Sequence, residues 1–326
     1  MSDARGPLFS LVNGEGAGAL LAAAAGDVAG AASGVAYSAL TQQATVVAYH
    51  LMANDGVQGI SLAREWSELA ADGSNPSVYR AVSPEFEEWV TKVETSEAQR
   101  SARPSAEPAG RVAPVGVWFR RRPAELVVGA LEVSRLTHLD ATTAVAASAM
   151  AGATAASCFA QTGRDLLSAA AEISRQALAL VEEEATFTNV DEARNFPPRL
   201  LEARSLIGAR PDRVLTEIGQ NAGPDEVLTA IVLASGSDPT AEGLLRASAE
   251  AGGSRLAAMV GALVGAREGI RNWPWEVPNS TWFAEIGRRL VSGHRETRDL
   301  PVPYFVEESL THGIDRDDHR PFPRPS

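Results

Sequence analysis

The chain has 326 residues, of which 45% are hydrophobic and 21% charged, a composition typical of a globular protein that excludes disorder throughout its length. Its net charge of −12 and pI of about 5.0 argue against binding along a nucleic acid backbone or on an anionic membrane, because both attract an excess of Lys and Arg. The one cysteine, Cys158, cannot form an intrachain disulfide, which suits a reducing compartment. We therefore expect a cytoplasmic protein with no nucleic acid or membrane partner.

The first predicted element is the Ala- and Gly-rich segment 16–35. It carries Asp27 at its centre and no basic cluster precedes it, so the pattern fits neither a membrane span nor a signal peptide, and we expect no export. Helical spacing of apolar residues recurs along the chain, while alternating β-branched runs are nearly absent, which predicts an all-α fold. The predicted helices cover residues 17–33, 45–54, 60–72, 85–98, 123–137, 141–162, 164–185 and 239–251.

A further helix follows Gly252 and Gly253. Five apolar residues fall on one of its faces, at i, i+3, i+4, i+7 and i+8: Leu256, Met259, Val260, Leu263 and Val264. Ala and Gly beside this face allow other helices to approach closely, so we expect a central position for this helix. Upstream, Asp140 is predicted to cap the N-terminus of the helix over 141–162, because its carboxylate can accept a hydrogen bond from a free amide of the first turn.

The organisation predicted is one compact helical domain over residues 1–293. Polar and Pro-rich stretches at 99–110 and 195–213 indicate connecting segments, but the composition does not change across either of them. Residues 294–326 are polar, charged and rich in proline, which predicts a loosely attached tail or a docking arm.

Several segments resemble, in the same order along the chain, the motifs of the ADP-ribosylglycohydrolases. The matches are Gly26-Asp27-Val28-Ala29-Gly30 with G-D-A-x-G, Thr41-Gln42-Gln43-Ala44 with T-D-D-T, Arg111-Val112-Ala113-Pro114-Val115-Gly116 with M-R-V-A-P-L-G, Leu136-Thr137-His138-Leu139-Asp140 with L-T-H-x-D, and Gly252-Gly253 with the start of G-G-D-x-D-[TS]. The resemblance implies a compact multi-helix ADP-ribosylglycohydrolase-like fold. It also implies two Mg²⁺ ions in a central cleft and hydrolysis of a glycosidic bond at the anomeric carbon of ADP-ribose, as in ADP-ribosyl-arginine.

The carboxylates that such a magnesium site requires are missing from the matching positions. Two neighbouring cations need several negatively charged oxygen ligands to offset their repulsion. The sequence T-Q-Q-A keeps one hydroxyl and two amide oxygens, while Gly253 runs directly into Ser254 and Arg255, which places a cation where the family has a metal ligand. Residues 106–110 also replace the G-N-G-[SA] substrate loop of the family. We therefore expect no cofactor, no metal ligands and a dismantled magnesium site.

Two carboxylates are candidate catalytic residues. Asp27 is the acidic residue that still matches the first motif, although a helix cap or a hydrogen-bonded structural role explains it equally well. Glu85 belongs to an acidic cluster after Ser83 and Pro84, which the first turn of a helix also explains, because negative charge is favoured there. The candidate ligand-binding residues are those at the motif positions: Thr41, Gln42, Gln43, Gly110, Arg111, Gly253, Ser254 and Arg255.

Three functions remain open. The first is a ligand-binding, regulatory or interaction module for an ADP-ribose-like or nucleoside-like small molecule, with a partner protein or a second copy of the chain as further options. The second is a metal-independent hydrolase or lyase of an N-glycoside, which needs a pair of carboxylates, and the sequence offers no convincing second one. The third is a structural subunit, favoured if Arg255 pairs with Asp27 and fills the cleft.

Overall fold

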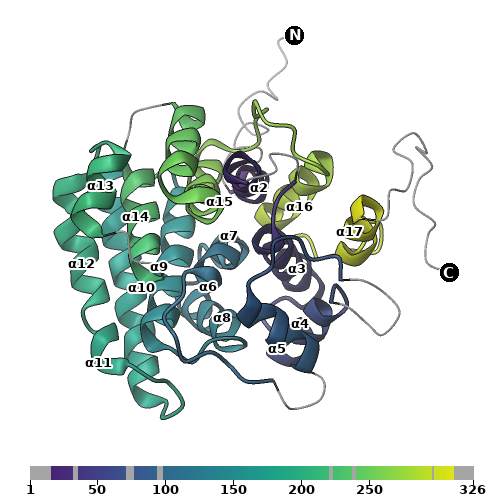
Figure 1. Ribbon diagram of the computed structural model, residues 1–326, viewed down its shortest axis with the longest axis horizontal. Coiled ribbons are helices and arrows are strands. Elements are labelled where there is room, and N and C mark those ends of the chain that lie inside the picture. The colour runs from purple at the N-terminus through teal and green to yellow at the C-terminus, as the bar shows by residue number, and fades with distance from the viewer. Residues whose placement is uncertain are drawn as a thin grey trace, which may run out of the picture.

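The computed structural model describes residues 16–31, 36–70, 77–93, 98–219, 223–236, 240–295 and 297–311. Over these ranges the regular elements are helices, there is no strand, and the two isolated bridges join Ser101 to His138 and Asp140 to Thr188. The predicted all-α fold is confirmed (Figure 1). Along the described part of the chain, no helix has the length and apolar character needed to cross a membrane.

The described part of the chain folds into a succession of helices. They are α2 (Ala19–Gly30), α3 (Ala39–Asn54), α4 (Gly59–Ser67), α5 (Pro84–Lys92), α6 (Glu107–Arg111), α7 (Ala113–Trp118), α8 (Pro123–Arg135), α9 (Ala141–Ser157), α10 (Gly163–Glu183), α11 (Val190–Ala193), α12 (Phe196–Glu202), the 3₁₀ helix η2 (Ala203–Leu206), α13 (Pro211–Ile218), α14 (Pro224–Ser235), α15 (Ala241–Glu268), α16 (Ser280–Ser292) and α17 (Pro303–Thr311). Each predicted helix overlaps one of them, with ends that differ by several residues, and the predicted positions 32–33, 71–72, 94–97 and 239 lie outside the described residues.

Helices α2 and α15 pack against each other with their backbones in contact (Figure 1). A Cβ atom at Gly26 would lie 2.1 Å from the carbonyl oxygen of Ala257, and one at Gly261 would lie 2.2 Å from that of Ala22. Only glycine therefore fits at these crossings. Residues 256–266 of α15 are all buried, as expected of a central helix.

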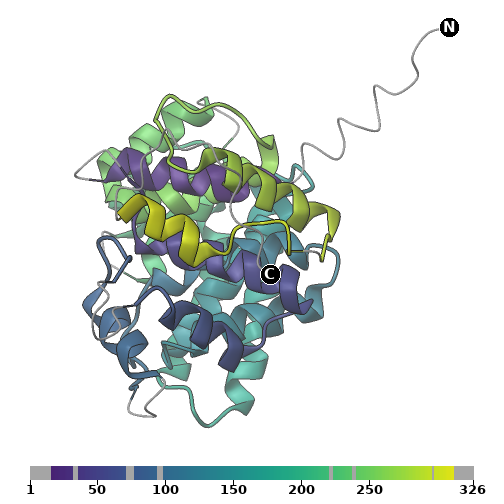
Figure 2. The same ribbon diagram turned by 90° about the vertical axis from the view of Figure 1, so that its right-hand side faces the viewer.

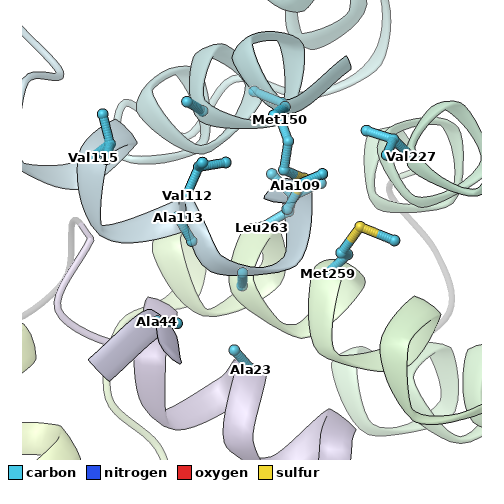
Figure 3. Close-up of a cluster of buried hydrophobic side chains, with 14 of the residues drawn as sticks. Ala23, Ala44, Ala109, Val112, Ala113, Val115, Met150, Val227, Met259 and Leu263 are labelled. Carbon is cyan, nitrogen blue, oxygen red and sulfur yellow. The ribbon is translucent and has the colours of Figure 1, made fainter. Parts of the chain in front are cut away.

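The core is built from small and flexible side chains contributed by several helices (Figure 3). Ala23 of α2, Ala44 of α3 and Ala109 of α6 meet Met150 of α9 and Met259 of α15 in one buried cluster. Helix α9 consists almost entirely of small residues and packs against α8, α10, α14 and α15. Because small side chains fill little space, the surrounding helices approach it closely.

Caps and breaks fix the ends of the helices that lead to the site. The Asp140 carboxylate accepts a hydrogen bond of 2.7 Å from the Thr143 amide at the start of α9, as predicted. Ser83 Oγ accepts a bond of 3.2 Å from the Phe86 amide and caps α5 in the same way. Helix α15 combines two predicted helices, which are joined at Gly253 by a kink with a φ angle of 75°. Such a positive φ favours glycine.

The segment after residue 293, predicted to be a loosely attached tail or a docking arm, contains a packed helix. Helix α17 lies against α3 (Figure 2), and two of its side chains are buried, Val306 at 4% exposure and Glu307 at 1%. The rest of the predicted tail, residues 312–326, lies outside the described ranges. The local composition is polar, but a buried apolar residue and a buried carboxylate fasten this helix to the domain.

Candidate functional site

A cavity of about 190 Å³ lies where the beginnings of α5, α6 and α14 approach the kink of α15. Its lining is mostly polar: Ser83, Glu85, Ser101, Arg103, Pro104, Ser105, Ala106, Glu107, His138, Gly223 and Arg255. Of the predicted site residues, Glu85 and Arg255 line it. A larger cavity of about 980 Å³, between α4, α5 and α8, contains none of the predicted residues. We assign the candidate site to the smaller cavity because residues from three motif segments converge there, Glu107, His138 and Arg255.

Glu107 is the residue in this cavity that sequence reasoning missed. Its side chain is 7% exposed, and both carboxylate oxygens are held by hydrogen bonds, Oε1 from Gln43 Nε2 at 2.9 Å and Oε2 from Ser83 Oγ at 2.7 Å. The available signal was the replacement of the G-N-G-[SA] loop by residues 106–110, which introduces a carboxylate at the substrate-loop position. The structure thus places a second acidic residue in the lining of the cavity that contains Glu85.

Arg111 lies beneath the cavity, not on its wall. The guanidinium is fully buried, stacks 4.6 Å from the centroid of the Trp66 ring, and donates to Gln43 Oε1 at 2.8 Å and to the hydroxyl of Thr137. Burial lowers the pKa of Arg111 to about 10, so the side chain remains charged at neutral pH. Gln43 links the guanidinium to Glu107, and the opposite charges of the two groups favour each other.

His138 connects this buried network to the cavity. Its Nδ1 lies 2.8 Å from Thr137 Oγ1, and its ring is 2% exposed. Burial, assisted by the positive charge of Arg111, lowers the pKa of His138 to about 3, so the imidazole is neutral near pH 7. Because Nδ1 is engaged with Thr137, the neutral imidazole has Nε2 left to offer the cavity wall as an uncharged hydrogen-bonding group.

Gln42 and Gln43 each make hydrogen bonds to protein groups through both the oxygen and the nitrogen of the amide. Gln42 Oε1 accepts from the Arg80 amide at 2.9 Å, while its Nε2 donates to the Val78 carbonyl at 2.8 Å and to Glu307 Oε2 at 2.9 Å. Gln43 Oε1 accepts from Arg111 while its Nε2 donates to Glu107. At both positions the amide oxygen faces an N–H donor and the amide nitrogen faces a carboxylate.

Asp27 and Thr41 are buried together, and neither lines the cavity. Asp27 Oδ2 accepts three hydrogen bonds, from the Ser38 amide at 2.9 Å, Ser38 Oγ at 2.8 Å and Thr41 Oγ1 at 2.7 Å. Within the described ranges its Oδ1 has no hydrogen-bond partner, and burial raises the pKa of the carboxyl group. Since Ser38 is the N-cap of α3, these contacts tie α2 to the start of α3.

Arg255 pairs with Glu226 of α14. Its Nε and one terminal nitrogen donate to the same carboxylate oxygen, at 2.8 and 2.5 Å. A pairing of Arg255 with Asp27, which would have favoured a purely structural subunit, is therefore not observed. The guanidinium remains at the cavity wall, close enough for the charge of Glu107 to act on it.

The remaining predicted residues shape the surrounding backbone. A Cβ atom at Gly110 would lie 2.5 Å from the Leu40 side chain, so this glycine allows α6 to pack against α3. The backbone amide of Ser254 lies 2.4 Å from the position of a Cβ atom at Gly30, and Gly253 makes the kink. None of these three predicted residues lines the cavity. Across the described ranges, no group of three or more His, Cys, Asp or Glu side chains is placed to hold a metal ion.

The helical architecture and the order of its motifs are those of one known class of proteins. The chain belongs to the ADP-ribosylglycohydrolase family, whose model matches residues 14–300. Among solved structures, it is similar to one described as an ADP-ribosylglycohydrolase-related protein complex, with a TM-score of 0.60 and 16% identity over 87% of this chain and 99% of that chain. At this identity the likeness shows the fold alone. No curated protein matches this sequence.

Proposed function

We propose that this protein binds a ribosyl-containing small molecule, ADP-ribose-like or nucleoside-like, in the 190 Å³ cavity, without the magnesium-dependent hydrolysis implied by its motifs. The observation that carries this proposal is that both amide atoms of Gln42 and of Gln43, the residues at the T-D-D-T positions, are hydrogen-bonded to protein groups. A polar cavity lies next to them while the groups that would hold a metal are engaged with other protein groups.

The residues at these positions do not fit a pair of magnesium ions. Mg²⁺ demands near-octahedral oxygen coordination, and both amide oxygens already accept hydrogen bonds from nitrogen donors. One of those donors is the charged guanidinium of Arg111, and a second guanidinium, that of Arg255, lies at the cavity wall. A dication near either group would be repelled and not stabilised. We therefore derive no chemical step through a metal.

The cavity offers the groups that recognise a sugar. Glu107 supplies a fixed carboxylate that can accept from ribose hydroxyls, and Ser105 and His138 supply neutral hydrogen-bonding groups. Its volume is below the roughly 300–1,000 Å³ typical of sites that enclose a drug-sized ligand, so a sugar or nucleoside portion fits inside while the remainder extends outward. The exposed Arg103 at the rim is suited to contact a phosphate there.

A thermal-shift titration with ADP-ribose, in Mg²⁺ and in EDTA, tests this function. At about a hundred times its dissociation constant a ligand stabilises the folded state by roughly 2.7 kcal/mol, which for this chain length is a rise in Tm of about 4 °C. We expect the same rise in both solutions and its loss in the isosteric variant Glu107→Gln. Glu87→Gln, a change on α5 outside the cavity lining, is the matched control and keeps the rise.

A rise that requires Mg²⁺ would contradict the proposal, and so would magnesium binding by Gln42→Asp/Gln43→Asp in isothermal titration. We expect that double variant to gain no magnesium affinity, because the second group of metal carboxylates is missing at residues 253–255. If neither ADP-ribose nor adenosine shifts the Tm, the ligand class is wrong.

The presence of two carboxylates, Glu85 and Glu107, in one cavity favours metal-independent hydrolysis of an N-ribosyl bond as a second candidate function. One carboxylate would take a proton from the attacking water as its oxygen bonds to the anomeric carbon. The other would protonate the departing nitrogen as the carbon–nitrogen bond breaks.

The second function is tested by measuring the rate at which ADP-ribose is released from ADP-ribosyl-arginine in EDTA. We expect Glu85→Gln and Glu107→Gln each to lower the rate by about 10²–10⁴-fold, the usual contribution of one acid or base. Glu87→Gln again serves as the control with an unchanged rate. Turnover that survives both cavity substitutions would assign the chemistry to other groups. Binding without any turnover would leave the ligand-binding function alone.

A further inference from the structure

The helix α17 lies beyond the part of the chain that matches the family, since the match ends at residue 300 and the helix begins at Pro303. It nevertheless packs onto α3 (Figure 2) and carries the deeply buried carboxylate of Glu307. A buried carboxylate is stable only where donors and a positive charge replace its water. The partners of Glu307 therefore identify what this helix binds.

Three side chains from other parts of the fold donate hydrogen bonds to this carboxylate. Tyr37 Oη donates to Oε1 at 2.7 Å, while Gln42 Nε2 and a terminal nitrogen of Arg80 donate to Oε2 at 2.9 and 2.6 Å. We call Tyr37, Gln42 and Arg80 the carboxylate receptor. It supplies a phenol, an amide and a guanidinium, a donor set that matches a single anionic group.

The receptor is also braced by contacts that do not involve α17. Arg80 stacks 4.5 Å from the centroid of the Tyr37 ring and donates through Nε to the Tyr37 carbonyl at 3.0 Å. Asn279, at the start of α16, donates to Tyr37 Oη at 3.1 Å. The receptor can bind a carboxylate because residue 42 is a neutral amide that donates a hydrogen bond to Glu307. A carboxylate at position 42 would instead repel Glu307.

The receptor is continuous with one wall of the ligand cavity. The segment 77–83 is fastened to α3 by three hydrogen bonds, from Gln42 to the Val78 carbonyl, from the Arg80 amide to Gln42, and from the Ala39 amide to the Arg80 carbonyl. The segment ends at Ser83, whose hydroxyl holds Glu107 at 2.7 Å. A group bound in the receptor therefore helps to hold segment 77–83, and with it Ser83, in position.

We propose that α17 is a latch acting within the chain: Glu307, seated in the carboxylate receptor, holds the segment 77–83 and thereby sets the ligand affinity of the cavity. The part that concerns ligand affinity rests on the proposed ligand-binding function. Release of α17 would make the segment 77–83, which carries Ser83, less firmly held. Binding of another acidic group of matching geometry in the carboxylate receptor would hold this segment again.

Hydrogen exchange of the full chain, followed by mass spectrometry, tests the latch with three variants. Gln42→Glu places a second carboxylate against Glu307, so we expect amide exchange in residues 303–311 and 77–83 to increase at least tenfold. Adding Glu307→Gln restores a donor opposite a carboxylate, so the double variant recovers part of the protection. Gln43→Glu is the matched control, because Gln43 contacts Glu107 and not Glu307, and it leaves α17 protected.

Titration of Gln42→Glu and of the double variant with ADP-ribose separates the latch from the proposed function. We expect Gln42→Glu to weaken binding at least tenfold and the double variant to regain part of it. Release of α17 with unchanged exchange in 77–83 would overturn the latch, as would equal exchange in Gln42→Glu and in Gln43→Glu. If no ligand binds the unaltered protein while exchange in 77–83 follows α17, the proposed function fails and the mechanical coupling stands.

Discussion

Replacing Arg111 by methionine is expected to lower the free energy of unfolding by about 3–5 kcal/mol, the usual cost of removing one partner from a buried ionic group. Methionine fills much of the space against Trp66, but the Gln43 oxygen and the Thr137 hydroxyl lose their donor. The nearby Glu107, 7% exposed, loses its compensating positive charge. Unfolding in urea, followed by circular dichroism, measures the difference.

Arg111→Lys is expected to recover little of this loss, because an ammonium group cannot donate in two fixed directions while stacking on an indole ring. The exposed Arg103→Met is the control and should change stability by no more than about 0.5 kcal/mol. A loss below about 1 kcal/mol for Arg111→Met would show that the network beneath the cavity does not depend on this charge.

Acidification from pH 7 to pH 4 is expected to remove about 3 kcal/mol of stability through His138 alone. In the unfolded chain this imidazole takes up a proton near pH 6.5, whereas in the folded state its pKa is about 3. The stability is therefore present above pH 6.5 and is lost progressively as the pH falls towards 3. Burial and the charge of Arg111 cause the shift.

Urea unfolding of His138→Gln at both pH values measures this contribution. The variant should lose about 3 kcal/mol less than the unaltered protein on acidification, whatever its stability at pH 7. His294→Gln, a change at an exposed histidine, should keep the original pH dependence. Identical pH dependence in all three proteins would mean that His138 is protonated within the fold.

The sequence predicted the helical part of the fold well because that information is local. Apolar spacing places residues 256–264 on one face of a helix, and the carboxylate of Asp140 caps α9 as expected. Composition was a poorer guide. The stretch 99–110, interpreted as a connecting segment, contains the beginning of α6 and Glu107, and the polar region after residue 293 contains α17. In both cases a few long-range contacts override the local composition.

The sequence by itself therefore determined the class of fold, the family and the presence of neutral amides at positions 42 and 43, since each follows from the order and spacing of residues. Only the tertiary structure decided the partners of those residues. Gln43 meets Glu107 across 64 positions, and Gln42 meets Glu307 across 265. The physical reason is that a buried polar group takes whichever partner the packing brings within hydrogen-bond distance, and no periodic pattern encodes that choice.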